Sequence, residues 1–162
     1  VNTQVVRPTV PVIRASGELI LGAGNSLFSL ATATATPVSI RTATSQFSTS
    51  PVLGRARGAL PSLGYAVTDT AEVVVFRDTG YLYSIQLPQF GRPSHPVLDC
   101  NRANPNSGTG ILYIAFESGA VVALIVDSPG LDPTSPWPKY QRTAGNHGNA
   151  AAVFPLNDGC PP

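Results

Sequence analysis

Few side chains in this chain are suited to catalysis or metal binding, and their spacing matches neither a nucleophilic triad nor a metal site. The two histidines, His95 and His147, stand in an extended connection and in a Gly/Asn-rich tail, where we expect both on the surface. No serine lies in a nucleophile elbow. Several aspartates lie near turns, which favour Asp for its local hydrogen bonds, namely Asp69, Asp78, Asp99, Asp127 and Asp132. The sequence therefore predicts no catalytic residues, no metal ligands and no cofactor, and does not favour an enzyme.

The chain contains two cysteines, Cys100 and Cys160, and neither has a Cys or His neighbour at metal-ligand spacing. The simplest interpretation is a disulfide between them, and two separate buried thiols are the alternative. A disulfide would close a loop of about 60 residues and stabilise the fold by roughly 4 kcal/mol. Because such a bond needs an oxidising compartment, we expect a secreted, periplasmic or cell-surface protein.

Composition argues against two classes of partner. Charged residues make up 12% of the 162 residues and the net charge is +1, which gives no electrostatic reason to expect nucleic acid or an anionic membrane. The longest apolar stretch, residues 111–126, is interrupted by Glu117 and Ser118 and is too short for a membrane span. Sixteen prolines and fifteen glycines, among many Val and Thr, indicate an all-β chain with frequent turns.

Three stretches of the chain repeat one pattern. Each opens with Pro-Val followed by Ile or Leu, at Pro11, Pro51 and Pro96, and these openings lie 40 and 45 residues apart. Each continues into two short apolar β-runs separated by a tight turn. The predicted pairs of runs are 18–21 with 26–30, 64–67 with 72–76, and 111–115 with 120–126. Such a period is typical of the four-stranded antiparallel blades of a β-propeller.

Three blades are fewer than a closed propeller contains, which is about four to eight. We expect a single partial propeller domain over residues 1–162, with blades at about 10–44, 50–88 and 96–149 and a C-terminal tail at 150–162. The chain contains no Met and starts in a β-prone stretch at Val1, which suggests a processed portion of a longer propeller of six to eight blades. A companion chain from the same precursor, or a second copy of this chain, would supply the missing blades.

Candidate binding residues lie on the rim loops and inner strands. Arg55 and Arg57 stand in a loop inserted after the first strand of the second blade, where solvated arginines are the simpler interpretation. Tyr65 and Tyr113 belong to the second strands of two blades, where we expect them either in a binding surface or packed between blades. Trp137 is the sole tryptophan, and its expected role is packing between blades, with ligand stacking as the alternative.

Two segments carry a resemblance to a known family. The Asp-Thr-Gly turn at 78–80, which leads into an aromatic-rich outer strand, resembles the repeat of bacterial pyrroloquinoline-quinone-type β-propellers, with Ser84 near the position of their docking Trp. Residues 135–149 look like the Ser-x-Trp-Pro segment that ends many of these propellers and supplies their last outer strand. The resemblance covers roughly residues 10–150. It implies a propeller fold and a family that includes both quinoprotein dehydrogenases and non-enzymatic envelope proteins.

Three functions are compatible with these observations. The favoured one is a non-catalytic binding or scaffold propeller of the bacterial envelope or exterior, whose rim loops present a surface to a protein or a glycan. The second is part of a quinoprotein-type or glycan-active enzyme, with the cofactor ligands on the missing blades. The third is a structural surface protein that assembles through its open blade faces.

Overall fold

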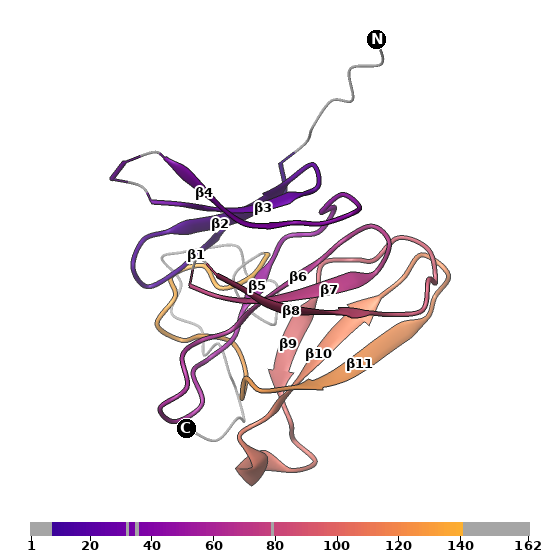
Figure 1. Cartoon of the computed structure of the whole chain (residues 1–162). Helices are drawn as coiled ribbons and strands as arrows, with labels where there is room; N and C mark the ends of the chain where they lie inside the picture. The colour runs from indigo at the N-terminus through magenta and orange to yellow at the C-terminus, as the bar shows by residue number, and fades with distance from the viewer. Residues whose placement is uncertain (1–7, 32, 35, 79, 141–162) are drawn as a thin grey trace.

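The computed structural model describes residues 8–31, 33, 34, 36–78 and 80–140, and within them the chain is all-β. Three antiparallel sheets follow one another along the chain and form successive layers (Figure 1). Sheet 1 contains β1 (Val12–Ile13), β2 (Leu19–Ala23), β3 (Ser26–Leu30) and β4 (Pro37–Thr42). Sheet 2 contains β5 (Val52–Leu53), β6 (Gly64–Val67), β7 (Glu72–Arg77) and β8 (Gly80–Gln86). Sheet 3 contains β9 (Val97–Cys100), β10 (Gly110–Ala115) and β11 (Val121–Val126), with the short 3-10 helix η1 (Pro105–Ser107) between its first two strands.

Short turns set the register of each hairpin. Gly24 and Gly119 adopt positive φ angles of 58° and 87° in the β2–β3 and β10–β11 turns, a conformation that glycine reaches without a steric penalty. Asp78, at the turn into β8, has a φ of 49°, which Asp tolerates better than most residues. The strands of each sheet therefore pair in chain order, and the predicted β-runs are confirmed to within one or two residues.

The first three strands of sheet 2, β5 to β7, are buried on both faces, whereas its outer strand β8 is mostly exposed. The apolar residues of β5 to β7 divide between two apolar cores, one shared with sheet 1 around Phe76 and Leu27, and one shared with sheet 3 around Tyr65 and Leu112. Every residue of β6 is buried, whereas β2 and β3 alternate between buried and half-buried positions. The continuous apolar runs of β6 and β7 match their burial on both faces. The runs of β10 and β11 in sheet 3 are also apolar, although one face of these two strands is partly exposed.

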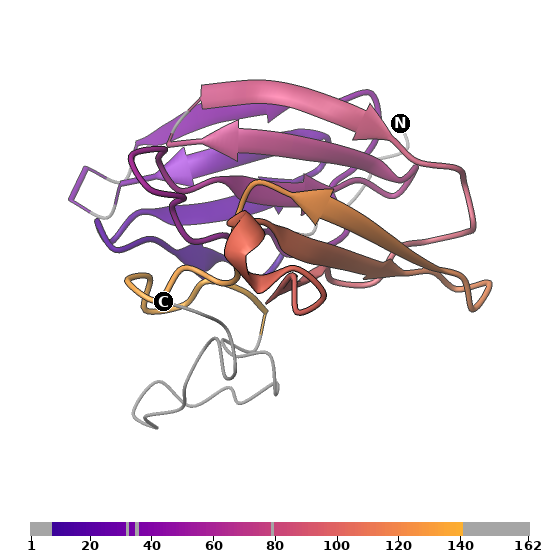
Figure 2. The same cartoon turned by 90° about the horizontal axis from the view of Figure 1, so that it is seen from below.

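The segment after β11 returns to the first strands of sheets 1 and 2. The backbone N–H of Ile13 donates to the carbonyl of Trp137 at 2.8 Å, and the N–H of Leu53 donates to the carbonyl of Pro138 at 2.7 Å. Figure 2 shows this segment, in yellow, beside the purple strands. The resemblance had implied that the Trp137 segment forms a last outer strand. The described part of that segment, residues 135–140, instead lies along the inner edges of β1 and β5 and satisfies their backbone groups, and its remainder lies outside the described residues.

The described part of sheet 3 has three strands and β11 is its edge, while sheets 1 and 2 have four strands each. Residues 141–149 of the predicted third blade lie outside the described residues. The sheets have the form of propeller blades, and the described residues form no closed ring. None of the described residues forms a helix long and apolar enough to cross a membrane.

Candidate functional site

A pocket of about 430 Å³ opens on the rim between sheets 2 and 3. One wall is the loop between β5 and β6, and the other is the loop between β9 and β10 together with the exit from β11. The lining residues are Arg55, Ala56, Arg57, Gly58, Pro105, Asn106, Gly108 and Pro129. The pocket is therefore built by two consecutive blades and contains two of the predicted candidates, Arg55 and Arg57.

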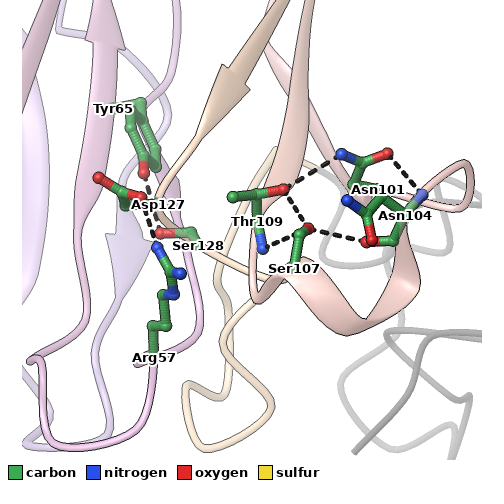
Figure 3. Close-up of polar contacts among 8 residues, drawn as sticks. All are labelled: Arg57, Tyr65, Asn101, Asn104, Ser107, Thr109, Asp127 and Ser128. Atoms are coloured by element: carbon green, nitrogen blue, oxygen red, sulfur yellow. Dashed lines mark hydrogen bonds and ion pairs between the residues drawn. The ribbon is translucent and has the colours of Figure 1, made fainter.

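Arg57 crosses from the loop of sheet 2 to sheet 3. Its Nη1 lies 2.8 Å from Oδ1 of Asp127, and both side chains are about half exposed, at 41% and 59% (Figure 3). The guanidinium also packs against Gly108, where a Cβ atom would lie 2.8 Å from Nε of Arg57. Gly108 has a φ of 66°, so the close approach and the backbone conformation both favour glycine. A guanidinium carries five donors, and a single carboxylate oxygen leaves others for a ligand.

Arg55 is fixed to the same neighbouring sheet. Its backbone N–H donates to the carbonyl of Gly130 at 2.8 Å, and its Nη2 donates to the carbonyl of Pro129 at 3.2 Å. Two arginines of one loop are thus held by the exit from β11. Contacts between sheets 2 and 3 therefore hold both positive charges of the pocket in position. We had expected the two arginines to be solvated instead.

The opposite wall is stiffened by hydrogen bonds within the β9–β10 loop (Figure 3). Ser107 Oγ lies 2.6 Å from Oγ1 of Thr109 and donates to the carbonyl of Asn104 at 2.7 Å. Asn101 donates through Nδ2 to Oγ1 of Thr109 at 3.1 Å, and its Oδ1 accepts the N–H of Asn104 at 3.2 Å. The side chains of Asn101, Ser107 and Thr109, together with the backbone of Asn104, therefore hold η1 and with it Pro105 and Asn106 in one place.

Directly beside the ion pair, Tyr65 links the two sheets. Its hydroxyl lies 2.9 Å from Oγ of Ser128, the residue after Asp127, and both side chains are buried (Figure 3). Burial raises the pKa of the Tyr65 hydroxyl well above its ordinary value, although the hydrogen bond from Ser128 opposes the shift. Tyr65 therefore packs between blades, as one of the two expectations for it had stated.

A second polar cluster lies where the return segment meets the connections between sheets. The Nδ1 atom of His95 accepts the N–H of Ser50 at 2.9 Å, and its ring stacks on Tyr140 with centroids 4.2 Å apart. The expectation of a surface histidine is thus wrong for His95, which is half-buried because its ring fills the space under Tyr140; His147 lies outside the described residues. Burial and the charge of Lys139 lower the pKa of His95.

Lys139 belongs to this second cluster and is only 1% exposed. Its Nζ donates to the carbonyl of Tyr140 at 2.7 Å. Burial lowers the pKa of Lys139 to about 8. Sequence reasoning missed this residue because lysine is rarely buried, and its neighbours in the sequence gave no indication.

The other predicted candidates lie away from the rim pocket. Tyr113 is 41% exposed on the face of sheet 3 that points away from sheet 2, and Trp137 is half-buried beside β1. Cys100 is buried at the end of β9, and Cys160 lies outside the described residues, so their pairing stays a prediction. Sequence reasoning also missed Asp127 as the partner of Arg57, because a turn residue and a rim arginine in different blades show no pattern that joins them.

The rim pocket presents positively charged guanidinium groups and hydrogen-bond donors, which can bind a ligand. Within the described ranges, no three His, Cys, Asp or Glu side chains lie close enough to hold a metal ion. The loops instead combine two guanidinium groups with the rings of Pro105 and Pro129 and the amide of Asn106. No family model, characterised protein or solved structure matches this chain, so the arrangement of these residues carries the functional argument.

Proposed function

We propose that this chain is a non-catalytic binding and scaffold protein of the bacterial envelope or exterior, part of a β-propeller that another chain or copy completes. The observation that carries the binding role is the rim pocket, where Arg55 and Arg57 are anchored across two sheets. Loops held by rigid sheets are a common place for recognition. The scaffold role is supported by strands β5 to β7 of sheet 2, which contribute to the apolar cores on both sides of the sheet and so fix its loops.

The chemistry of the pocket favours a ligand with a carboxylate. Guanidinium groups bind planar carboxylates through paired, charge-assisted hydrogen bonds. Asp127 already makes one charge-assisted hydrogen bond to Nη1 of Arg57, and a ligand carboxylate would use other donors of the same guanidinium. The proline rings of the lining supply apolar surface beside the charge. An acidic ligand is therefore preferred over a neutral one.

The size of the pocket favours an acidic saccharide over a protein surface. A volume of about 430 Å³ is near the lower end of the range for small-ligand sites, and protein interfaces are larger and flatter. The ring faces of a sugar would lie against Pro105 or Pro129, with its carboxylate toward the arginines. This assignment makes the ligand a uronic-acid glycan of the kind found outside cells.

Isothermal titration calorimetry with digalacturonate tests the proposal, with a neutral disaccharide as the matched ligand. We expect digalacturonate to bind and Arg57→Gln to weaken it at least about 10-fold, because hydrogen bonds to charged groups are worth about 1.5–3 kcal/mol. Added salt should weaken binding in the same direction. Arg102→Gln is the control variant, since Arg102 is a rim arginine of sheet 3 that does not line the pocket.

Equal binding of the neutral disaccharide would contradict the role of the arginines. Unchanged affinity in both Arg55→Gln and Arg57→Gln would place the ligand elsewhere. Asn101→Ala provides a separate check, because it removes two hydrogen bonds behind the wall without touching the pocket, and we expect a smaller loss of affinity.

A further inference from the structure

The three sheets stack with the same faces in the same order. Val12 opens sheet 1 and packs toward sheet 2, and Val52, at the same place in sheet 2, packs toward sheet 3. The following residue of each first strand points to the opposite face. Leu53, after Val52, packs on sheet 1, and Leu98, after Val97, packs on sheet 2. Each sheet therefore has a forward face, toward the following sheet, and a backward face, toward the preceding one.

The forward face of sheet 3 corresponds to the covered forward face of sheet 2. Tyr65 pairs with Val52 as Tyr113 pairs with Val97, so that the two tyrosines are equivalent. Tyr65 is 1% exposed under sheet 3, whereas Tyr113 is 41% exposed. The forward face of sheet 3 thus has the residues of a blade interface without a blade on it within the described chain.

The third strands show the same difference. Val73 in β7 is 1% exposed, and the equivalent Val121 in β11 is 64% exposed. Ile125, four residues after Val121 on the same face of β11, is 71% exposed. The face is apolar except for Asp99 near the rim, and its members are Val97, Asp99, Ile111, Tyr113, Ala115, Val121, Ala123 and Ile125.

Among the described residues, no sheet packs on the backward face of sheet 1. In sheet 2 the backward face is formed by buried residues such as Val74 and Phe76. The equivalent positions in sheet 1 are Phe28 and Leu30, which are half-buried. The backward face of sheet 1 consists of five half-buried residues, Ile13, Leu19, Leu21, Phe28 and Leu30.

We propose that the forward face of sheet 3 binds the backward face of sheet 1 in a second copy of this chain, and that the same contact forms reciprocally. The proposed contact continues the interface that already joins sheets 1 and 2 and sheets 2 and 3. Two copies would close a ring of six blades, within the four to eight that propellers contain, whereas three copies would exceed it. This inference rests on the proposed function, in which another chain or copy completes the propeller, and it names the copy.

Light scattering during size-exclusion chromatography of the full chain tests the inference. We expect a mass twice the 16.8 kDa of one chain. Val121→Asp on sheet 3 and Leu21→Asp on sheet 1 should each shift the mass to one copy. Leu60→Asp is the matched control, because Leu60 is 58% exposed on a rim loop outside both faces, and it should leave two copies.

Mixing the two single-face variants gives a second readout. A mixture of Val121→Asp and Leu21→Asp retains one intact pair of faces, so we expect partial recovery of the two-copy mass. Circular dichroism of each variant should match the unmodified chain, which separates loss of contact from loss of fold.

A mass of one copy for the unmodified chain at the highest soluble concentration would overturn the inference, as would a larger polymer or a two-copy mass that Val121→Asp leaves intact. Co-purification with a different chain on this face would also overturn it. Digalacturonate titration of the same samples distinguishes the two proposals. Binding with a one-copy mass rejects this inference alone, and a two-copy mass without binding rejects the proposed function alone.

Discussion

The hydroxyl of Tyr65 in β6 lies 2.9 Å from Oγ of Ser128, just beyond the end of β11, and this bond joins sheet 2 to sheet 3 in a buried position. It lies next to the ion pair between Arg57 and Asp127. The rim pocket is therefore attached to the core through one short stretch of chain, residues 127–130.

Tyr65→Phe should lower the free energy of unfolding by about 1–2 kcal/mol, because it removes a buried hydrogen bond and leaves Ser128 without this partner. Tyr83→Phe is the matched control, since Tyr83 is a half-exposed tyrosine of β8, and its effect should stay within about 0.5 kcal/mol. Urea unfolding followed by fluorescence measures both. Equal effects of the two substitutions would show that the bond between sheets contributes nothing.

Gly54→Ala should lower the free energy of unfolding by about 1–3 kcal/mol through overpacking. A Cβ atom on Gly54 would overlap the side chain of Ser128, which lies between the two sheets. Gly80→Ala is the control, because a Cβ there would meet only the carbonyl of Arg77 at 3.4 Å, an ordinary contact. Thermal unfolding of the two variants measures both effects. An unchanged stability of the Gly54→Ala protein would contradict the close packing of the sheets.

The strands and their turns could be predicted from the sequence, because apolar runs of Val, Ile and Leu flanked by Gly or Asp turns depend on local chain properties. The return of residues 131–140 to β1 and β5 could not. It depends on backbone hydrogen bonds such as that from Ile13 to Trp137, and these carry no side-chain pattern. The rim pocket was half predictable: Arg55 and Arg57 were noticed, but their partners come from another blade.

Acid should destabilise the protein through His95. Its pKa is lowered in the folded state, so the unfolded chain takes up the proton first as pH falls below about 6.5, and the free energy of unfolding falls with it. His95→Asn keeps an acceptor for the N–H of Ser50 but does not titrate. Urea unfolding at pH 7.5 and pH 5 should show a smaller drop for His95→Asn. Any contribution of His147 is the same in both proteins and cancels in the comparison. An identical decrease in the free energy of unfolding for the two proteins would contradict this role for His95.

Lys139 should change the free energy of unfolding at alkaline pH. Its pKa is about 8 in the folded protein and about 10.4 when unfolded, so the folded state loses its proton first as pH rises. The free energy of unfolding should therefore increase between pH 8 and about 9.5, below the range where Tyr65 opposes the trend. Lys139→Met should abolish the increase. Since Lys139 is the only lysine, amine labelling of its peptide reports its titration directly, and an ordinary lysine profile would reject the shift.

The predicted disulfide can be tested by mass. Under denaturing, non-reducing conditions, a thiol-alkylating reagent should leave Cys100 and Cys160 unmodified, and after reduction it should modify both. Reduction should lower the free energy of unfolding by roughly 4 kcal/mol in the chain-entropy model. A Cys100→Ser, Cys160→Ser protein serves as the reference that no reductant affects. Alkylation of both thiols before reduction would establish the alternative of two separate cysteines.

The edge strand β11 has a consequence for handling the protein. Its sequence, Val-Val-Ala-Leu-Ile-Val at residues 121–126, has no charge, no proline and no glycine, and no described strand pairs with its outer edge. Six-residue segments of this composition are the kind that stack into amyloid-type fibrils when an edge is open. A strand that pairs with this edge would therefore also protect against aggregation, and we expect a preparation without such a strand to form insoluble cross-β material through β11.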